Sequence, residues 1–261
     1  MTALRSLAFN AVFFGWTAVM MVLALPLLPL SRAAVRRVGR FWSWTNLQLV
    51  QGICGLGYEI RGRAHLPEGP CIIAAKHQSA WDTLIFNILV ESPAYIFKKE
   101  LLRIPLFGWY LVAAGCIPID RSGGAGALRR LIGDARRTLE AGRKIVIFPE
   151  GTRVAPGAHR PHHPGTAALY TQLGVPVVPV AVNSGLYWGR RSFLKRPGRI
   201  VLECLPPIPP GLPRKAFAAE LERRIEEATN RLPGIAPAQA QEESAGDAAG
   251  PPERAVDKFV N

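Results

Sequence analysis

Three short apolar runs rich in β-branched residues constrain the fold of this chain more than any other feature. They read CIIAA at residues 71–75, IVIF at 145–148 and VPVVPVAV at 175–182. Such runs are typical of strands buried on both faces, as in a sheet covered by helices. Segments with helical character lie between and after them, at residues 82–90, 126–141, 166–173 and 214–231. Strands that alternate with helices predict an α/β fold.

The N-terminal stretch is the second constraint, because it carries no charge between Arg5 and Arg32. At about 1.5 Å per residue, a helix of this length crosses a membrane core of about 30 Å. A cleaved signal peptide fits less well, because the apolar run is long and no small-x-small cleavage site precedes the basic stretch. Pro26 and Pro29 near its end also allow a re-entrant or interfacial helix.

The stretch that follows mixes arginines with Phe41, Trp42 and Trp44. Cations beside indoles favour anionic headgroups at a membrane boundary, although an ordinary amphipathic surface helix is the alternative. The residues after Pro233 are mostly Ala, Pro, Gln, Glu and Gly. We therefore predict a membrane-associated helical segment over 1–53, an α/β domain over 54–233 and a disordered tail over 234–261.

The net charge of +13, from 32 Lys and Arg against 19 Asp and Glu, indicates an anionic partner. The candidates are nucleic acid, an anionic membrane and a phosphorylated substrate. No segment matches a nucleic-acid-binding module, and the apolar N-terminal stretch argues against one. The apolar content of 49% excludes a wholly disordered chain.

Neither the cysteines nor the histidines predict a metal site. The cysteines lack CxxC spacing and lie in apolar surroundings, which favours reduced thiols in a cytoplasmic environment. They stand at positions 54, 71, 116 and 204. His159, His162 and His163 are close together, but Pro161 and Pro164 place them in a loop.

The first candidate site is KHQSAWD at residues 76–82, directly after the CIIAA run. Five residues rotate a helix by about 500°, so His77 and Asp82 would point apart within one helix. They meet only if His77 lies in the strand-to-helix turn and Asp82 in the first helical turn. Asp82 would then accept a hydrogen bond from His77 Nδ1 and leave Nε2 as a base. Alternatively, Ser79 and Asp82 form a capping box, and His77 is only a polar turn residue.

The second candidate site, FPEGTR at residues 148–153, also follows a buried strand, where open α/β sheets bind ligands. Gly151 would let the backbone approach a ligand closely, and Arg153 offers a planar donor group that fits phosphate oxygens. Glu150 could accept a hydrogen bond from a hydroxyl or pair with Arg153. A plain turn with a surface ion pair is the alternative.

Two further stretches are basic and partly apolar. KKELLRIPLFG at 98–108, with GCIPIDR at 115–121, offers cations for a phosphate and an apolar wall for a chain, or is a solvated basic face. GRRSFLKR at 189–196 could contact phosphate headgroups or an acidic carrier protein, or form a solvated loop.

Together these stretches resemble the glycerolipid acyltransferase family, specifically bacterial 1-acyl-sn-glycerol-3-phosphate acyltransferases. KHQSAWD resembles the first family motif, KKELLRIPLFGWY with GCIPIDR the second, FPEGTR the third, and VPVVPVAV with Pro179 the fourth. The resemblance covers residues 40–210, with the motifs in the family's order. The chain departs from the pattern at Lys76, where the family often has Asn. We expect this change to affect local packing or charge rather than the chemistry, although it could bear on substrate choice.

The resemblance implies a helix-covered mixed sheet and transfer of an acyl group from a thioester to the 2-hydroxyl of 1-acylglycerol-3-phosphate, forming phosphatidic acid. It places His77 and Asp82 in the catalytic positions and implies no metal or cofactor. The expected substrate-binding residues are Lys98, Arg121, Glu150, Gly151, Thr152 and Arg153.

The expected partners are acyl-acyl-carrier protein or acyl-CoA as donor, lysophosphatidic acid and an anionic membrane, with no nucleic acid. The expected location is the inner membrane, with the active site facing the cytoplasm. Two alternatives stay open. One is an acyltransferase that acts on lyso-ornithine lipid or another lysophospholipid, and the other is a non-catalytic membrane lipid-binding protein.

Overall fold

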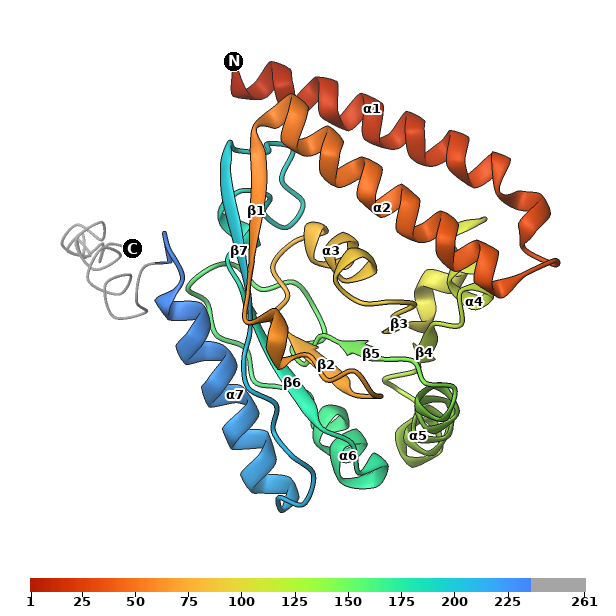
Figure 1. The fold of residues 1–261 in the computed structure, drawn as a ribbon, viewed down its shortest axis with the longest axis vertical. Helices are drawn as coiled ribbons and strands as arrows, with labels where there is room; N and C mark the ends of the chain where they lie inside the picture. The colour runs from red at the N-terminus through yellow and green to blue at the C-terminus, as the bar shows by residue number, and fades with distance from the viewer. Residues whose placement is uncertain (236–261) are drawn as a thin grey trace, which may run out of the picture.

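The computed structural model describes residues 1–235, which are built around a seven-stranded sheet with the order β1-β7-β6-β2-β5-β3-β4 (Figure 1). The strands are β1 (Leu56–Arg61), β2 (Ile72–Ala75), β3 (Ala94–Lys98), β4 (Ile117–Ile119), β5 (Ile145–Ile147), β6 (Val177–Val182) and β7 (Gly198–Cys204). The three apolar runs form β6, β2 and β5 at the centre of the sheet, where both faces are covered. The α/β prediction is confirmed.

The sheet is mixed, as the family resemblance implies. Strands β6, β2, β5, β3 and β4 are parallel to one another. Strand β7 pairs antiparallel to β6, and β1 pairs parallel to β7. The carboxyl ends of five adjacent strands therefore lie along one edge, and the residues that follow β2, β5 and β6 come together there. This is the edge at which open α/β sheets bind ligands.

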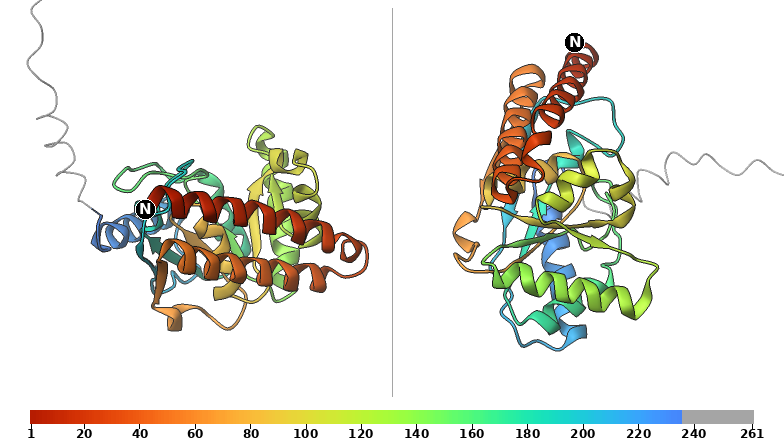
Figure 2. Two further views of the ribbon diagram at one scale, coloured as in Figure 1. Left: turned by 90° about the horizontal axis from the view of Figure 1, so that it is seen from above. Right: turned by 90° about the vertical axis from the view of Figure 1, so that its right-hand side faces the viewer.

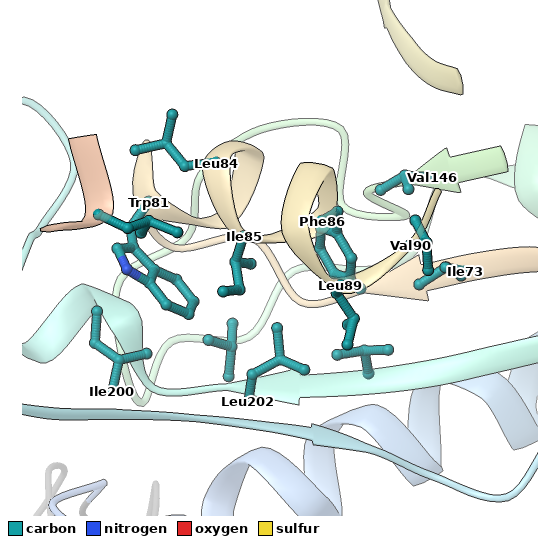
Figure 3. Packing of buried hydrophobic residues seen from close by; sticks show 14 of the residues in the cluster. Ile73, Trp81, Leu84, Ile85, Phe86, Leu89, Val90, Val146, Ile200 and Leu202 are labelled. Atoms are coloured by element: carbon teal, nitrogen blue, oxygen red, sulfur yellow. The ribbon is translucent and has the colours of Figure 1, made fainter. Parts of the chain in front are cut away.

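Side chains of the central strands alternate between two helix-covered faces, which explains why these strands are apolar throughout. On one face, Ile73 and Val146 pack with Ile85 of α3 (Figure 3). On the other face, Ile72 and Ile145 pack with α5, α6 and α7. The helices that follow β2 are α3 (Trp81–Leu89), α4 (Phe107–Ala113), α5 (Gly124–Glu140), α6 (Pro164–Leu173) and α7 (Arg214–Arg231).

The uncharged N-terminal stretch forms the first arm of a helical hairpin (Figure 2). Helix α1 (Thr2–Leu23) ends before Pro26 and Pro29, and α2 (Arg32–Cys54) returns beside it. Proline within a helix removes a backbone hydrogen bond, so the two prolines fall in the reversal between the arms. Ser31 caps α2 by accepting a hydrogen bond from the Ala34 main-chain N–H at 3.2 Å.

Helix α1 is attached to the rest of the molecule by buried polar and apolar contacts. Ser6 and Phe9 are fully buried, and the Phe9 ring meets Trp188 edge-on with centroids 5.4 Å apart. The main-chain N–H of Lys195 donates to Ser6 Oγ at 2.9 Å, and Lys195 Nζ donates to Asn10 Oδ1 at 2.8 Å. These contacts join the first half of α1 to the loop before β7.

The structure also bears on the segment boundaries. Helix α2 ends at Cys54, and the sheet begins with Leu56, next to the predicted boundary between residues 53 and 54. Ile235 is buried in one cluster with Ala228 and Leu232. The predicted disordered tail, from residue 236 onward, lies outside the described residues.

Candidate active site

The turn between β2 and α3 brings His77 and Asp82 together. His77 Nδ1 lies 2.9 Å from Asp82 Oδ2, which also accepts the main-chain N–H groups of Gln78 at 2.7 Å and Ser79 at 2.8 Å. An ionised carboxylate only accepts hydrogen bonds, so Nδ1 carries the hydrogen and Nε2 is the free ring nitrogen. One carboxylate therefore both holds the turn and orients the imidazole. The capping box is only half formed, because Ser79 Oγ accepts the Trp81 N–H rather than that of Asp82.

The other oxygen of Asp82 is held by a turn that the sequence did not predict as part of the site. Ser184, directly after β6, donates its hydroxyl to Asp82 Oδ1 at 2.5 Å. The next residue, Gly185, donates its main-chain N–H to Gln78 Oε1 at 3.0 Å. Asp82 and Ser184 are buried, so these bonds fix the carboxylate in a site shielded from water.

The FPEGTR segment supports His77 from the neighbouring strand β5. The Phe148 ring stacks on the His77 ring with centroids 3.9 Å apart. The main-chain N–H of His77 donates to Glu150 Oε2 at 3.0 Å, and its carbonyl accepts the N–H of Val154 at 2.8 Å. Both the ring and the backbone of His77 are therefore positioned by residues 148–154.

Glu150 is buried and points toward Lys76 rather than Arg153. Its Oε1 lies 2.7 Å from Lys76 Nζ, which is also 2.6 Å from Glu226 Oε1 on α7. Burial raises the pKa of Glu150, and the Lys76 ammonium opposes this rise. Glu226 is a further residue that sequence analysis missed, because nothing local relates α7 to the catalytic turn.

Arg153 lies near the Asp82 carboxylate. Burial lowers the pKa of its guanidinium, while the nearby charge of Asp82 raises it and that of Arg190 lowers it. Arg190 Nη1 also donates to the Arg153 carbonyl at 3.4 Å. Part of the basic run at 189–196 therefore reaches the FPEGTR turn.

Arg121 reaches the same turn from the end of β4. Gly151 has a φ of 69°, which favours glycine, and a Cβ there would lie 2.7 Å from Arg121 Nη1, so the guanidinium lies directly against this turn. Thr152 is half-buried between Gly151 and Arg153. Lys98 is exposed at the end of β3, which places it on the same edge of the sheet.

The three histidines of residues 159–163 have separate environments. His159 Nε2 lies 2.7 Å from Glu222 Oε1, and His163 Nδ1 accepts the main-chain N–H of Gly165 at 3.4 Å. Burial lowers the pKa of His162 to about 4, so its imidazole is uncharged at neutral pH. Among residues 1–235, no group of three or more His, Cys, Asp or Glu side chains is placed to hold a metal ion.

This arrangement suits proton removal from a hydroxyl beside an anionic group. The His77 side chain is 12% exposed, so it is reachable by a substrate, whereas that of Asp82 is 2% exposed. A neutral imidazole with a fixed tautomer acts as a general base, and the carboxylate stabilises the imidazolium that forms. The nearby guanidinium groups fit the oxygens of a phosphate.

Comparison with known proteins identifies the family. A family model described as "Acyltransferase" matches residues 57–183. The 1-acyl-sn-glycerol-3-phosphate acyltransferase of Pseudomonas aeruginosa is 36% identical over 225 residues, which cover 86% of this chain and 87% of that protein. The chain belongs to the acyltransferase family. The mouse 1-acyl-sn-glycerol-3-phosphate acyltransferase alpha is 29% identical over 204 residues, covering 76% of this chain and 70% of the mouse protein.

The acyltransferase fold is also seen in a solved structure. The crystal structure of the 1-acyl-sn-glycerophosphate acyltransferase PlsC from Thermotoga maritima matches with a TM-score of 0.72. The match covers 90% of this chain and 100% of that one, at 20% sequence identity. This match confirms the mixed, helix-covered sheet that the resemblance implies.

Proposed function

We propose that this acyltransferase moves a fatty acyl group from a thioester to the 2-hydroxyl of 1-acylglycerol-3-phosphate, which yields phosphatidic acid. The proposal rests on the 2.9 Å contact between His77 and Asp82 at the carboxyl edge of the sheet, with Arg121 and Arg153 beside it. The names of the similar proteins from Pseudomonas and mouse support the same acceptor.

The substrate itself supplies the nucleophile in the proposed mechanism. His77 Nε2 takes the proton of the acceptor hydroxyl while the hydroxyl oxygen bonds to the thioester carbonyl carbon. The tetrahedral intermediate then collapses, the carbon–sulfur bond breaks, and His77 returns the proton to the leaving thiolate. Asp82 keeps the imidazole in the required tautomer throughout. No acyl-enzyme forms.

The phosphate of the acceptor is assigned to Arg153, Arg121 and Lys98. Arg153 and Arg121 lie at the turn that Gly151 and Thr152 shape, and Lys98 lies at the end of β3 on the same edge of the sheet. One guanidinium group can donate two parallel hydrogen bonds to two oxygens of a phosphate, whereas the Lys98 ammonium would act as a single positive charge. We place Glu150 in the support of the turn, because its carboxylate is buried against Lys76 and His77.

The hydrocarbon part of a substrate has a candidate site next to the hairpin. A cavity of about 740 Å³ lies between α1, α2, the end of α3 and α4. Its lining includes Met20, Trp42, Leu89 and Leu111. The cavity is lined by the C-terminal end of α3, whereas the turn that carries His77 lies at its N-terminal end.

Membrane association is assigned to the hairpin. Among residues 1–235, α1 is the one helix long and apolar enough to cross a membrane. However, its first half bonds to the Lys195 loop, and its far end lies beside the arginines of α2. A spanning orientation would draw the Lys195 ammonium, which is bonded to Asn10 within α1, into the hydrocarbon, at a high cost in free energy. We therefore propose that the hairpin lies within one leaflet, with exposed side chains such as Leu7 and Phe14 in lipid.

The donor and the location follow from the same reasoning. Both acyl-acyl-carrier protein and acyl-CoA are anionic thioesters, and both fit a chain with a net charge of +13. Because such donors are supplied in the cytoplasm, we place the enzyme at the inner membrane with its active site on the cytoplasmic side.

The test of the activity is an assay with purified protein that crosses two donors with several acceptors. Acyl-acyl-carrier protein and acyl-CoA are each offered with lysophosphatidic acid, another lysophospholipid and lyso-ornithine lipid. We expect phosphatidic acid as the main product, measured by mass spectrometry. A preference for lyso-ornithine lipid would replace the proposed acceptor, and no transfer with either donor would favour a non-catalytic lipid-binding protein.

The membrane assignment is tested by placing charges on the lipid-facing side of α1. Leu7→Asp and Phe14→Asp change exposed residues, so the fold should persist while binding to anionic vesicles falls. Leu212→Asp is the matched control, because Leu212 is exposed in the loop before α7. Unchanged vesicle binding of the double variant would contradict the proposed orientation.

A further inference from the structure

Lys76 is an ammonium group enclosed within the protein. The residue is 2% exposed and is among the largest fully buried side chains. Its Nζ lies 2.7 Å from Glu150 Oε1 and 2.6 Å from Glu226 Oε1. An isolated buried charge is strongly unfavourable, and here two carboxylates face the same ammonium group.

Glu150 links this buried cation to the catalytic turn. One of its oxygens faces Lys76, and the other accepts the main-chain N–H of His77 at 3.0 Å. Lys76 and His77 are consecutive in the chain, so one carboxylate holds both the side chain of the first and the backbone of the second. The ring stacked on Phe148 depends on that backbone position.

The neutral asparagine that the resembling family often has at this position could offer a hydrogen bond but no charge. In this chain, Glu226 supplies a second carboxylate from α7, which faces the same ammonium group. The lysine at position 76, which departs from the family pattern, therefore has an oppositely charged partner in Glu226.

We propose that Lys76 is a positioning residue, whose buried charge keeps Glu150 ionised so that Glu150 holds the His77 backbone in its reactive position. This inference rests on the proposed role of His77 as the base. It assigns Lys76 no contact with a substrate.

The charges around Glu150 determine what loss of Lys76 would do. Burial and the charge of Glu226 raise the pKa of Glu150, while Lys76 and the His77 N–H lower it. His162, which also lies near Lys76, is uncharged at neutral pH, and the charge of Glu222 acts on His162. No cation other than Lys76 is among the groups that act on Glu150 within residues 1–235. Without Lys76, Glu150 would face Glu226 in a buried site and would take up a proton.

The experiment compares the pH dependence of kcat for wild type and Lys76→Met. An opposite charge at this distance lowers a carboxyl pKa by about 1–3 units, so its loss should move the acid limb of kcat upward by a similar amount. The sign follows because the ionised carboxylate is required, so activity is lost as pH falls through the raised pKa of Glu150. His77 must also be unprotonated to act as the base, so the limb moves once Glu150 is the group that protonates first. We expect kcat to fall about tenfold at neutral pH, the scale of a lost charged hydrogen bond, with the acceptor KM unchanged.

Glu226, the second carboxylate at Lys76, provides a variant that tests whether the charge around Glu150 causes the shift. Lys76→Met combined with Glu226→Gln removes the repulsion on Glu150, so the acid limb should return part of the way, whereas Glu226→Gln alone should move it slightly downward, because the charge of Glu226 raises the pKa of Glu150. Lys76→Gln carries the same pH test if the methionine variant fails to fold, because its amide keeps a donor for the carboxylate. Lys144→Met is the matched control, since Lys144 Nζ donates only to the carbonyl of Glu68.

A readout independent of catalysis separates this inference from the proposed activity. The NMR resonance of the His77 amide should titrate with Glu150, at a higher pH in Lys76→Met than in wild type. An unchanged titration with an unchanged acid limb in the folded variant would overturn the inference, as would a change in acceptor KM alone. If wild type transfers no acyl group but the His77 amide titration shifts, the proposed function fails and the linkage stands.

Discussion

Two sets of charged residues lie at the carboxyl edge of the sheet, and they differ in how their charge is balanced. In the inner set, Lys76, Asp82 and Glu150 are buried. Lys76 pairs with Glu150, and Asp82 accepts backbone N–H groups. In the outer set, Arg121 and Arg153 lie at the FPEGTR turn, and no ion pair joins either of them to a carboxylate within residues 1–235. The inner charges are paired within the protein, whereas the outer guanidinium groups could pair with an anion from outside.

This difference separates two tasks. The inner set fixes the imidazole before a substrate arrives, which is the preorganisation that efficient proton transfer requires. In the proposed function, the outer set has guanidinium groups outside any ion pair of residues 1–235, which would attract and orient an anionic acceptor. Changes in the inner set should therefore alter kcat, and changes in the outer set should alter the acceptor KM and its dependence on salt.

The largest effect is expected when the inner set loses its base. His77→Ala removes the group that takes the hydroxyl proton, so turnover should fall by about 10²- to 10⁴-fold or more, while the fold is retained. The measurement is the rate of phosphatidic acid formation, with circular dichroism as the check on folding. His65→Ala is the matched control, because the His65 ring bonds to the Cys204 carbonyl away from the catalytic turn. Near-normal turnover of His77→Ala would eliminate the mechanism.

A smaller loss is expected in the outer set from Arg153→Gln. Removing one charged hydrogen-bond donor to phosphate costs about 1.5–3 kcal/mol, so kcat/KM for the acceptor should fall roughly 10- to 100-fold, mainly through KM. The salt dependence of KM should also weaken, because one cation no longer contributes to the field. Arg129→Gln on the exposed side of α5 serves as the control. An equal loss with an acceptor that lacks phosphate would show that Arg153 does not bind the phosphate.

The sequence predicted the centre of the fold better than its margins. Strands β2, β5 and β6 were found because both of their faces are buried and every residue is apolar. Strands at the sides of the sheet were not predicted from the sequence, because they carry polar or partly exposed residues, such as Glu59 in β1 and Lys98 in β3. Strand β4 is only three residues long and contains Pro118, which is an unfavourable strand residue.

The candidate site shows the same limit on a smaller scale. The contact between His77 and Asp82 joins residues five positions apart, so the spacing of one motif was enough to suggest it. Ser184 meets Asp82 across 102 positions, and Glu226 meets Lys76 across 150. Such partners depend on the strand order and on where α7 packs, and no local pattern in the sequence contains that information.

The smallest expected effect tests whether the inner set depends on Ser184, which is far from Asp82 in the sequence. Ser184→Ala removes the hydroxyl that donates to Asp82 Oδ1, while Oδ2 keeps its three contacts. Loss of one bond to a carboxylate whose other oxygen keeps three contacts should cost about 1.5 kcal/mol, or about tenfold in kcat. The acceptor KM should not change, because Ser184 supports the base and not the phosphate site. Ser192→Ala, a hydroxyl change in the loop before β7, is the control in the same steady-state assay. A rise in KM at constant kcat would place Ser184 with the outer set and remove the distinction between the two.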